Sequence, residues 1–383
     1  MIYLDNNSTT QIHPIVLETM LPFLIQNFGN PASLHTLGMD AKNAVDSSRQ
    51  FISKAIRAKP KEIVFTSGGT EANNLAILGS AFVRPERRHL IISAIEHESV
   101  TNPAKRLEND GYKLTILKVD RYGNIDPDEL ISAISEETFL VSIAIANHEI
   151  GTIQNIKLLS EIAHSKGIWF HTDAAQALGK IPFNVANLGI DMASFTAHKL
   201  HGPKGVGALY AGRNTRPNKI MEGTSQEYSL RPGTENVSAI VGFGKAVDIA
   251  INDLEEVCDH VRPMQKRLSD GLKEIKYSTL NGGGVEDRLL GNLSFKFGYI
   301  EGEAILMHLS NRGIYVSSGS TCGSNSDQPS TVLTAIGHSP EEANSTIRFS
   351  LSRFNSLAEI EDVVKNVKQV VKLLRDMTPG VPD

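Results

Sequence analysis

The 383-residue chain is poor in cysteine and has no excess of basic residues. Two cysteines, Cys258 and Cys322, cannot build a disulfide framework, which favours a reducing compartment. A net charge of −5 argues against direct binding to nucleic acid or to anionic membranes. No apolar run approaches the roughly 20 residues of a membrane-spanning helix, and Met1 to Asp5 form no basic-then-apolar leader. We therefore expect a cytoplasmic globular protein.

The sequence does contain a regular alternation of amphipathic helices and short apolar strands. Alternation of this kind is typical of βαβ units, so we expect an α/β fold with a mainly parallel sheet covered by helices on both faces. The strands are expected at residues 63–66, 89–95, 113–119, 139–146, 168–171, 190–193 and 206–210, and helices at 71–82 and 156–165.

The alternation of helices and short strands ends at about residue 255, where a long helix is expected over residues 254–275. It is followed by expected strands at 292–297 and 314–317 and by a final helix at 358–377. We expect three parts: an N-terminal segment (1–14) that packs with the small domain, a large domain (15–255) and a small α+β C-terminal domain (256–383).

Lys199 is the most informative residue of the chain. It lies in Ser194–Gly205, after an expected strand and between the hydroxyl of Thr196 and the rigid Gly202-Pro203 turn. A lysine held at a strand end beside a hydroxyl that can bind phosphate suits Schiff-base chemistry with pyridoxal phosphate. The amine has to be partly desolvated and held against the aldehyde carbon. The alternative is a surface lysine in a polar loop.

Two further segments fit the same cofactor. Asp173 follows an expected strand, where a carboxylate can keep a pyridine nitrogen protonated. It precedes Lys199 by 26 residues, so both can lie at strand ends on one edge of the sheet. The Gly69-Thr70 pair opens a helix, whose N-terminus attracts phosphate, and no Gly-Lys-Ser/Thr follows as in a nucleotide P-loop. The alternatives are a capping aspartate and an ordinary glycine turn.

Polar residues after other strands extend this pattern. His97 can stack on a planar ring or move protons near neutral pH, and Asn147 offers a similar polar group. Arg348 can grip a carboxylate with its planar guanidinium. Each has a plain structural alternative: a structural histidine, a polar turn, and a surface ion pair made by either Arg348 or Arg353.

Cys322 lies in a Gly/Ser-rich stretch from Ser317 to Ser330 that cannot pack as core. A cysteine displayed in such a loop is unusual, because cysteine is among the most buried residues. Its thiolate can attack the sulfur of a bound substrate and carry it away as a persulfide. The alternative is an incidental thiol. Cys258 has helical spacing and is expected to be inert packing.

Taken together and in this order, these segments resemble the NifS/IscS-like cysteine desulfurases, which are fold-type I pyridoxal-phosphate enzymes. The resemblance runs nearly end to end, from Tyr3–Thr10 and Phe28–His35 to Arg348–Phe354. Single motifs are shared with other fold-type I enzymes, but their joint order is specific to this group. It implies that the protein converts L-cysteine to L-alanine and passes the sulfur to an acceptor protein.

The resemblance also implies a role for each residue. Lys199 would bind pyridoxal phosphate covalently and carry a proton, and Cys322 would hold the sulfur as a persulfide. His97 would stack on the cofactor ring, while Asn147 and Arg348 would position the substrate, with Arg348 on its carboxylate. The remaining cofactor contacts would be Asp173 to the pyridine nitrogen, Gln176 to the ring oxygen, Gly69, Thr70, Thr196 and His198 to the phosphate, and Thr234 to the phosphate of the partner subunit of a homodimer. No metal is implied.

The Ser-Ser-Gly-Ser-x-Cys form around Cys322 resembles the group with a long, mobile catalytic loop, which would let Cys322 reach both cofactor and acceptor. Thr321 and Gly323 stand where this group has Ala and Ser or Thr, and Thr196 replaces a serine but keeps the hydroxyl. Other functions stay open: an aminotransferase or selenocysteine lyase on the same fold, or a non-catalytic scaffold. The acceptor can belong to iron–sulfur, tRNA-thiolation or DNA-phosphorothioation machinery.

Overall fold

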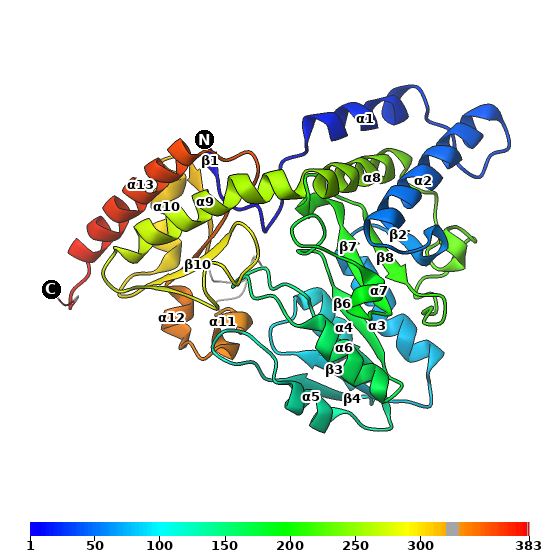
Figure 1. The fold of residues 1–383 in the computed structure, drawn as a ribbon, viewed down its shortest axis with the longest axis horizontal. Coiled ribbons are helices and arrows are strands. Elements are labelled where there is room, and N and C mark those ends of the chain that lie inside the picture. The colour runs from blue at the N-terminus through cyan, green and yellow to red at the C-terminus, as the bar shows by residue number, and fades with distance from the viewer. Residues whose placement is uncertain (319–328, 381, 383) are drawn as a thin grey trace.

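The computed structural model describes residues 1–318, 329–380 and 382. Figure 1 shows an elongated molecule with a large sheet in one half and a smaller sheet in the other. The large sheet has seven strands in the order β2-β8-β7-β6-β5-β3-β4. The strands are β2 (Ile63–Thr66), β3 (His89–Ser93), β4 (Lys113–Leu117), β5 (Thr138–Ser142), β6 (Trp169–Asp173), β7 (Met192–Thr196) and β8 (Gly207–Ala211).

The large sheet is mainly parallel, as predicted. The pairs β3–β4, β3–β5, β5–β6 and β6–β7 are parallel, whereas β8 runs antiparallel to both β2 and β7. Parallel strands are usually buried on both faces, and in β6 the successive residues Trp169 and Phe170 lie in two different hydrophobic clusters. The sheet is therefore the middle layer of three.

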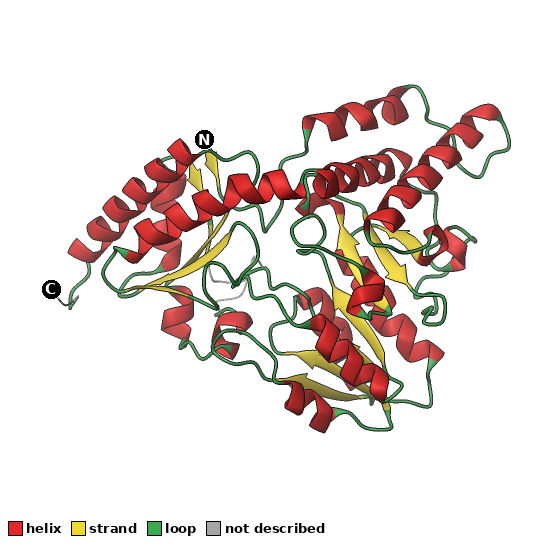
Figure 2. Cartoon of the chain, viewed as in Figure 1, coloured by secondary structure: helices red, strands yellow, loops and turns green. Residues whose placement is uncertain are grey.

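Helices cover both faces of this sheet (Figure 2). Buried residues of α3 (Gly69–Val83) and α4 (Glu98–Asn109) join one cluster. The other cluster takes residues from α1, α2, α5, α6, α7 and α8. Helix α6 shows why such helices form: Ile156, Leu159 and Ala163 recur on one face and are buried, and the Asn155 side chain caps the first turn. The helices of this second layer are α1 (Pro14–Ile25), α2 (Thr36–Ala55), α5 (Pro127–Ala133), α6 (Ile156–Ser165), α7 (Val185–Leu188) and α8 (Val237–Asn252).

The smaller sheet is antiparallel, in the order β12-β13-β10-β9. Its core also takes residues of the two long helices α9 and α13, and Asp253 alone separates α8 from α9 (Figure 1). The elements are α9 (Leu254–Lys273), β9 (Ser278–Leu280), β10 (Asn292–Phe297), α10 (Gly302–Ser310), β12 (Ser317–Ser318), α11 (Thr331–Ala335), α12 (Pro340–Asn344), β13 (Thr346–Ser350) and α13 (Leu357–Asp376).

The N-terminal segment runs beside the smaller sheet. Strand β1 (Ile2–Tyr3) pairs in parallel with β11 (Ile314–Tyr315), and Asp5 forms a bridge to Ser350 on β13. The domain bounds at residues 15 and 255 stay a prediction. No helix in the part of the chain that the structure describes is both long and apolar enough to cross a membrane.

Several expected strands have other bounds in the structure; for example, the strand expected at residues 139–146 is β5, which ends at Ser142. The single strand expected at residues 314–317 is two short strands in different sheets, β11 and β12, which are separated at Val316. The strand expected at residues 190–193 is β7, which begins at Met192 and continues to Thr196. This strand continues through Ser194 and Thr196 because its antiparallel pairing with β8 extends to Thr196 opposite Gly207. Thr196 is therefore a strand residue.

Candidate active site

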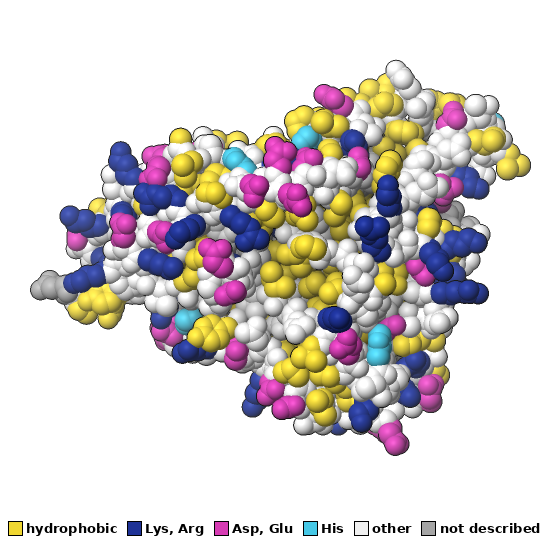
Figure 3. Space-filling view, viewed as in Figure 1, with side chains coloured by type: hydrophobic (Ala, Val, Ile, Leu, Met, Phe, Trp, Pro, Cys, Tyr) yellow, Lys and Arg dark blue, Asp and Glu magenta, His cyan; other side chains and the backbone are white. Residues whose placement is uncertain are grey.

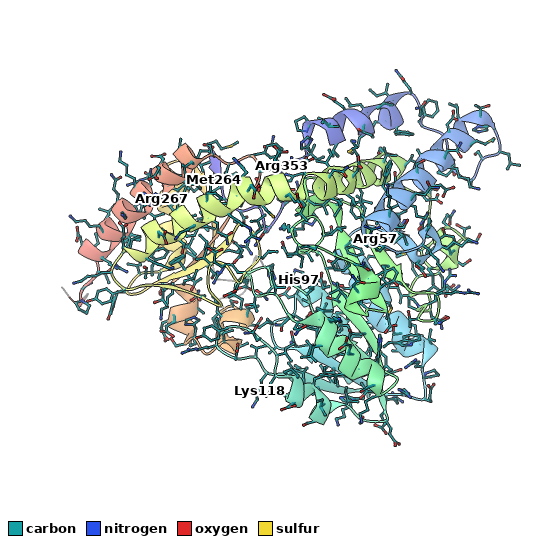
Figure 4. The ribbon with its side chains drawn as sticks, viewed as in Figure 1. Arg57, His97, Lys118, Met264, Arg267 and Arg353 are labelled. Carbon is teal, nitrogen blue, oxygen red and sulfur yellow. The ribbon has the colours of Figure 1, made fainter. Side chains whose placement is uncertain are left out.

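A cavity of about 460 Å³ lies where the carboxyl ends of the parallel strands meet the smaller sheet. Open α/β sheets bind ligands at this edge. In Figure 4 the labelled His97 lies between the two halves of the molecule. The lining side chains discussed below are Asn7, Ser8, Gly69, Thr70, Asn73, Glu96, His97, Ser99, Asn147, His148, Asp173, Gln176, Thr196, His198, Lys199 and Arg348, with Ser317, Ser318, Thr331 and Val332 at the rim of the smaller sheet.

Lys199 lies directly beyond the end of β7, in the short 3-10 helix Ala197–Lys199. Its Nζ donates to the backbone carbonyls of Asn7 and Ser8, the latter at 2.8 Å. The neighbouring His198 contacts Thr9 through Nδ1, at 3.2 Å from Oγ1. Burial, followed by the positive charge of Lys199, lowers the pKa of His198 to about 4, so His198 is neutral at pH 7.

Asp173 is the last residue of β6 and is buried. Its Oδ1 accepts from the N–H of Ala175 at 2.9 Å, and its Oδ2 accepts from Nδ2 of Asn73 at 2.8 Å. Each carboxylate oxygen keeps a further lone pair, because an ionised carboxylate offers about four acceptor sites. Asp173 therefore presents acceptor capacity to the cavity beside Lys199.

Helix α3 presents an uncapped N-terminus to the same cavity. Its first residues are Gly69 and Thr70, and the N-cap residue Gly68 supplies no side-chain hydrogen bond. The close approach of this turn to the sheet requires glycine at position 207, where a Cβ would come within 2.7 Å of the Gly68 backbone. Thr196 on β7 lies on the other side of the turn. Free N–H groups and two hydroxyls thus gather where an anion can bind.

Gln176 belongs to a network that the sequence analysis did not detect. Its Nε2 donates to the Asn7 carbonyl at 2.9 Å, and its Oε1 accepts from Nζ of Lys180 at 2.8 Å. Burial, followed by the charges of Lys199 and Arg348, lowers the pKa of Lys180 to about 7. Lys180 follows Gln176 by four residues. This spacing did not predict a contact between the two side chains, because no helix was expected there.

Arg348 on β13 reaches the cavity from the smaller sheet. Its Nη2 donates to Asp5 Oδ1 at 2.7 Å and to Ser8 Oγ at 2.6 Å, and its Nη1 donates to the His148 carbonyl at 3.3 Å. The buried Nε has no partner among the residues described. Arg353 also forms an ion pair, with Asp253 at 2.5 Å, but unlike Arg348 it does not line this cavity.

Asn147 is fixed within its own loop. Its Oδ1 accepts from the N–H groups of Glu149 and Ile150, and its Nδ2 donates to the Ile95 carbonyl at 2.9 Å. One N–H hydrogen is left over for a ligand. The adjacent His148 lies edge-on to His97, with ring centroids 5.4 Å apart, and burial lowers its pKa well below the usual range.

Glu96, next to His97, is a further buried acid that the sequence analysis did not single out. Its Oε1 accepts from Ser93 Oγ at 2.5 Å and from the Ala144 N–H at 2.9 Å. Burial raises the pKa of this carboxyl to about 8, although both hydrogen bonds act in the opposite direction. Glu96 is therefore mostly protonated at neutral pH.

Two predicted features lie away from this cluster, and Cys322 lies outside the described residues. Thr234 is exposed and does not line the cavity of its own chain, and Cys258 on α9 is partly buried. Among residues 1–318 and 329–380, no group of histidine, cysteine and acidic side chains could hold a metal ion.

The residues around the cavity fit pyridoxal phosphate by the chemistry of their donors and acceptors. An uncapped helix N-terminus suits the phosphate, a buried carboxylate suits a protonated pyridine nitrogen, and a lysine stands between them. Gln176 keeps one amide hydrogen after its bond to Asn7, which suits a ring oxygen.

The chain was compared with known proteins. The family model of aminotransferase class V matches residues 2–363. Curated cysteine desulfurases named IscS from Methanosarcina thermophila and Dictyoglomus turgidum are each 44% identical, over 100% and 99% of this chain and 94% and 96% of their own. Among solved structures, a NifS-like protein has a TM-score of 0.92 at 36% identity, covering 97% of this chain and 100% of its own. SspA in complex with cysteine has a TM-score of 0.82 at 37% identity, covering 93% and 100%.

Proposed function

We propose which residues of this chain carry out its reaction. The premise is that the chain belongs to the aminotransferase class-V family and is a cysteine desulfurase. The substrate is L-cysteine, the organic product is L-alanine, and the sulfur leaves on Cys322 for an acceptor protein. The family depends on pyridoxal phosphate, and the donors and acceptors around the cavity support the same cofactor here. The observation that carries the assignment is the meeting of Lys199, Asp173 and Arg348 in one cavity.

Each part of the cofactor has a matching part of the cavity. The first turn of α3, with Gly69 and Thr70, would hold the phosphate together with Thr196 and His198. Asp173 would pair with the pyridine nitrogen and Gln176 with the ring oxygen, while Lys199 would supply the amine that binds the cofactor covalently. When bound, pyridoxal phosphate supplies an electron sink for the α-carbon of the substrate.

Arg348 would bind the substrate carboxylate. Asp5 and Ser8 hold Nη2 of its guanidinium, and the unpartnered Nε keeps a donor in reserve. Asn147, next to the His148 carbonyl that Arg348 contacts, offers its remaining N–H hydrogen. With the substrate so placed, Lys199 would take and return the proton at the α-carbon, and His97 would cover the cofactor ring.

The sulfur step would form one bond and break one. The Cys322 thiolate attacks the substrate sulfur, the carbon–sulfur bond breaks, and a proton completes L-alanine while the sulfur stays on Cys322 as a persulfide. The two described flanks of residues 319–328 support this role. Ser317 and Ser318 line the cavity on one side, and Thr331 and Val332 line it on the other.

We also infer a homodimer in the cytoplasm. Helix α1 buries only Val16 and Met20, while Leu24 and Ile25 at its C-terminal end and Phe28 in the segment after it are exposed. Figure 3 shows apolar side chains over this helix. An exposed apolar face of this kind is typical of an interface, and Thr234, exposed in its own chain, would then reach the phosphate of the partner subunit.

The assignment of Cys322 is tested by measuring alanine and sulfide released from L-cysteine by the holoenzyme in the presence of a reductant. We expect Cys322→Ala to lower turnover at least about a hundredfold, because the sulfur has lost its acceptor. Cys258→Ala, which removes the other cysteine, is the matched control and is expected to turn over normally. Normal turnover by Cys322→Ala would contradict the proposal, and a 2-keto acid product would instead favour an aminotransferase.

A further inference from the structure

His97 caps the N-terminus of α4. Its Nδ1 accepts from the backbone N–H of Ser99 at 3.0 Å. A cap has to accept a hydrogen bond, and an imidazole nitrogen that carries a proton cannot do so. The neutral ring therefore carries its proton on the other nitrogen, Nε2.

A second set of hydrogen bonds requires the same placement of the proton. Nδ2 of Asn73 lies 2.8 Å from Asp173 Oδ2 and 2.8 Å from Ser99 Oγ, so its two hydrogens go to these two oxygens. Because an ionised Asp173 can only accept, the orientation of the Asn73 amide is fixed. The Ser99 hydroxyl, which accepts from Asn73, has one hydrogen of its own left. That hydrogen points to His97 Nδ1, at 2.8 Å.

The chain Asp173–Asn73–Ser99–His97 is held firmly. Asn73 is fully buried and Ser99 is buried. Oδ1 of Asn73 is buried with no partner among the described residues. Leaving a buried acceptor unpaired is unfavourable. The amide keeps this orientation nonetheless, because Asp173 and Ser99 both accept a hydrogen bond from its Nδ2.

His97 lines the cavity, and Figure 4 shows it between the two halves of the molecule. Nδ1 is taken up by Ser99, and within the described part of the chain Nε2 makes no hydrogen bond, so Nε2 is the ring nitrogen left for a ligand. We propose that Asn73 and Ser99 are positioning residues that hold the His97 proton on Nε2, so that the imidazole meets L-cysteine as a hydrogen-bond donor. This inference rests on the proposed function.

The consequence concerns the substrate sulfur. With its proton on Nε2, His97 can donate a hydrogen bond at that atom but cannot take up a proton there. Because Arg348 is assigned to the substrate carboxylate, the acceptor of L-cysteine left for His97 is the sulfur. This hydrogen bond would hold the sulfur in place for attack by Cys322.

The test compares three variants of the holoenzyme. Ser99→Ala removes the hydroxyl, Ser99→Thr keeps it, and Ser238→Ala is the matched control. Ser238 is likewise the second residue of a helix, α8, and its hydroxyl contacts the side chain of the capping residue, Asn236. We expect kcat/KM for alanine formation to fall about tenfold in Ser99→Ala, the equivalent of one hydrogen bond. Ser99→Thr and Ser238→Ala should stay within about twofold of the wild type.

A direct measurement is the 15N NMR spectrum of protein labelled at its histidine ring nitrogens, with the His97 signals assigned by difference from His97→Gln. We expect an unprotonated Nδ1 in the wild type. In Ser99→Ala, where the backbone N–H of residue 99 is the donor that remains, we expect a measurable share of the other tautomer. A protonated Nδ1 in the wild type, or a Ser99→Thr variant as impaired as Ser99→Ala, would overturn the proposal. If the wild type formed no alanine, the proposed function would fail, whereas the spectrum would still decide the tautomer.

Discussion

Glu96 and Lys180 are ionisable side chains at the cavity whose pKa values are displaced mainly by burial. Glu96 accepts hydrogen bonds from Ser93 and from the Ala144 N–H, and no cation pairs with it in the part of the chain described. A buried carboxyl without a cation favours its neutral form. Its protonation is therefore coupled to the free energy of unfolding.

We predict that Glu96 makes the protein less stable as pH rises. Burial raises the pKa of Glu96 from 4.5 to about 8, so the folded state holds a proton that the unfolded state has lost between these values. The stabilisation is complete below pH 4.5 and is lost as pH rises through 8. It amounts to roughly 5 kcal/mol in full, of which about 4 kcal/mol is lost between pH 5 and pH 9. Urea unfolding at pH 5 and pH 9 should show this loss in the wild type and not in Glu96→Gln.

The exposed neighbour Glu98 provides the control, because Glu98→Gln changes the same charge on the same turn without burial. Glu98→Gln should unfold with the pH dependence of the wild type. A Glu96→Gln variant that loses as much stability between pH 5 and pH 9 as the wild type would contradict the prediction. The amide that Glu96→Gln introduces can still accept from Ser93 and Ala144, so the substitution mainly removes the titration.

The sequence predicted the cavity residues that directly follow strands, but it did not predict the residues that form hydrogen bonds to them. Asp173 and Lys199 could be predicted to share an edge, because carboxyl ends of parallel strands meet there. Asn73 lies 100 residues from Asp173 and 26 from Ser99, so only the folded chain brings the three together. Asn7 contacts Lys199 across 192 residues. Such contacts leave no local pattern.

At the scale of elements, histidine side chains cap α1, α2 and α4. Histidine is not among the favoured N-cap residues, and it accepts a hydrogen bond only while its ring is neutral. A positive ring would also oppose the positive end of the helix dipole. Among these caps, the pKa of His13 on α1 is lowered, mainly by burial, so acid is expected to act on the first turn of α1.

We predict that the first turn of α1 opens more readily as pH falls. The N–H of Ile15 donates to Nδ1 of His13 at 3.3 Å, and burial, followed by the charge of Arg353, lowers the pKa of His13 below 6.5. A lowered pKa means that the capped, neutral form is stabilised above pH 6.5 and is lost as pH falls through the folded value. Hydrogen exchange at the Ile15 amide should report an opening equilibrium about fivefold larger at the acid end.

His13→Asn supplies a cap that does not titrate, and its Ile15 amide should show no such acid opening. The amide of Leu158 is an internal control, because Asn155 caps α6 in the wild type. Acid opening of Ile15 in His13→Asn to the same extent as in the wild type would count against the histidine cap. The intrinsic rate of amide exchange also depends on pH, and the same correction for it applies to the wild type and to His13→Asn.

Most elements followed from periodicity, and the exceptions depend on pairing with segments remote in sequence. Residues 156–165 and 292–297 were predicted with the bounds observed, since each carries a clear period and a polar boundary. Residues 314–318 split between two sheets because β11 pairs with the N-terminal strand and β12 with β13. That choice depends on partners remote in sequence. The strand order and the antiparallel direction of β8 likewise come from tertiary pairing.

At the scale of the whole molecule, apolar residues of α1 and of the segment after it are exposed to solvent, as expected of a surface that binds another chain. Phe28 is 71% exposed and Leu34 is 94% exposed, although both are large and apolar. A second copy of the chain is a suitable cover, since most soluble oligomers are symmetric homo-oligomers. The same dimer would explain why Thr234 is exposed on a loop away from the cavity of its own chain.

If Thr234 serves the partner's site, two inactive variants should restore activity to each other. Lys199→Ala removes the amine, and Thr234→Asp places a negative charge where the phosphate of the partner's cofactor would lie. A dimer of one subunit of each kind has one site with both residues intact. After an equal mixture is allowed to exchange subunits, alanine formation should recover to about one quarter of wild-type activity, since half of the dimers are mixed and each has one good site.

A mixture of Lys199→Ala with the double variant is the control and should stay inactive, because none of its sites has both residues. Recovery in the control, or none in the first mixture despite proven exchange, would place Thr234 outside the partner's site.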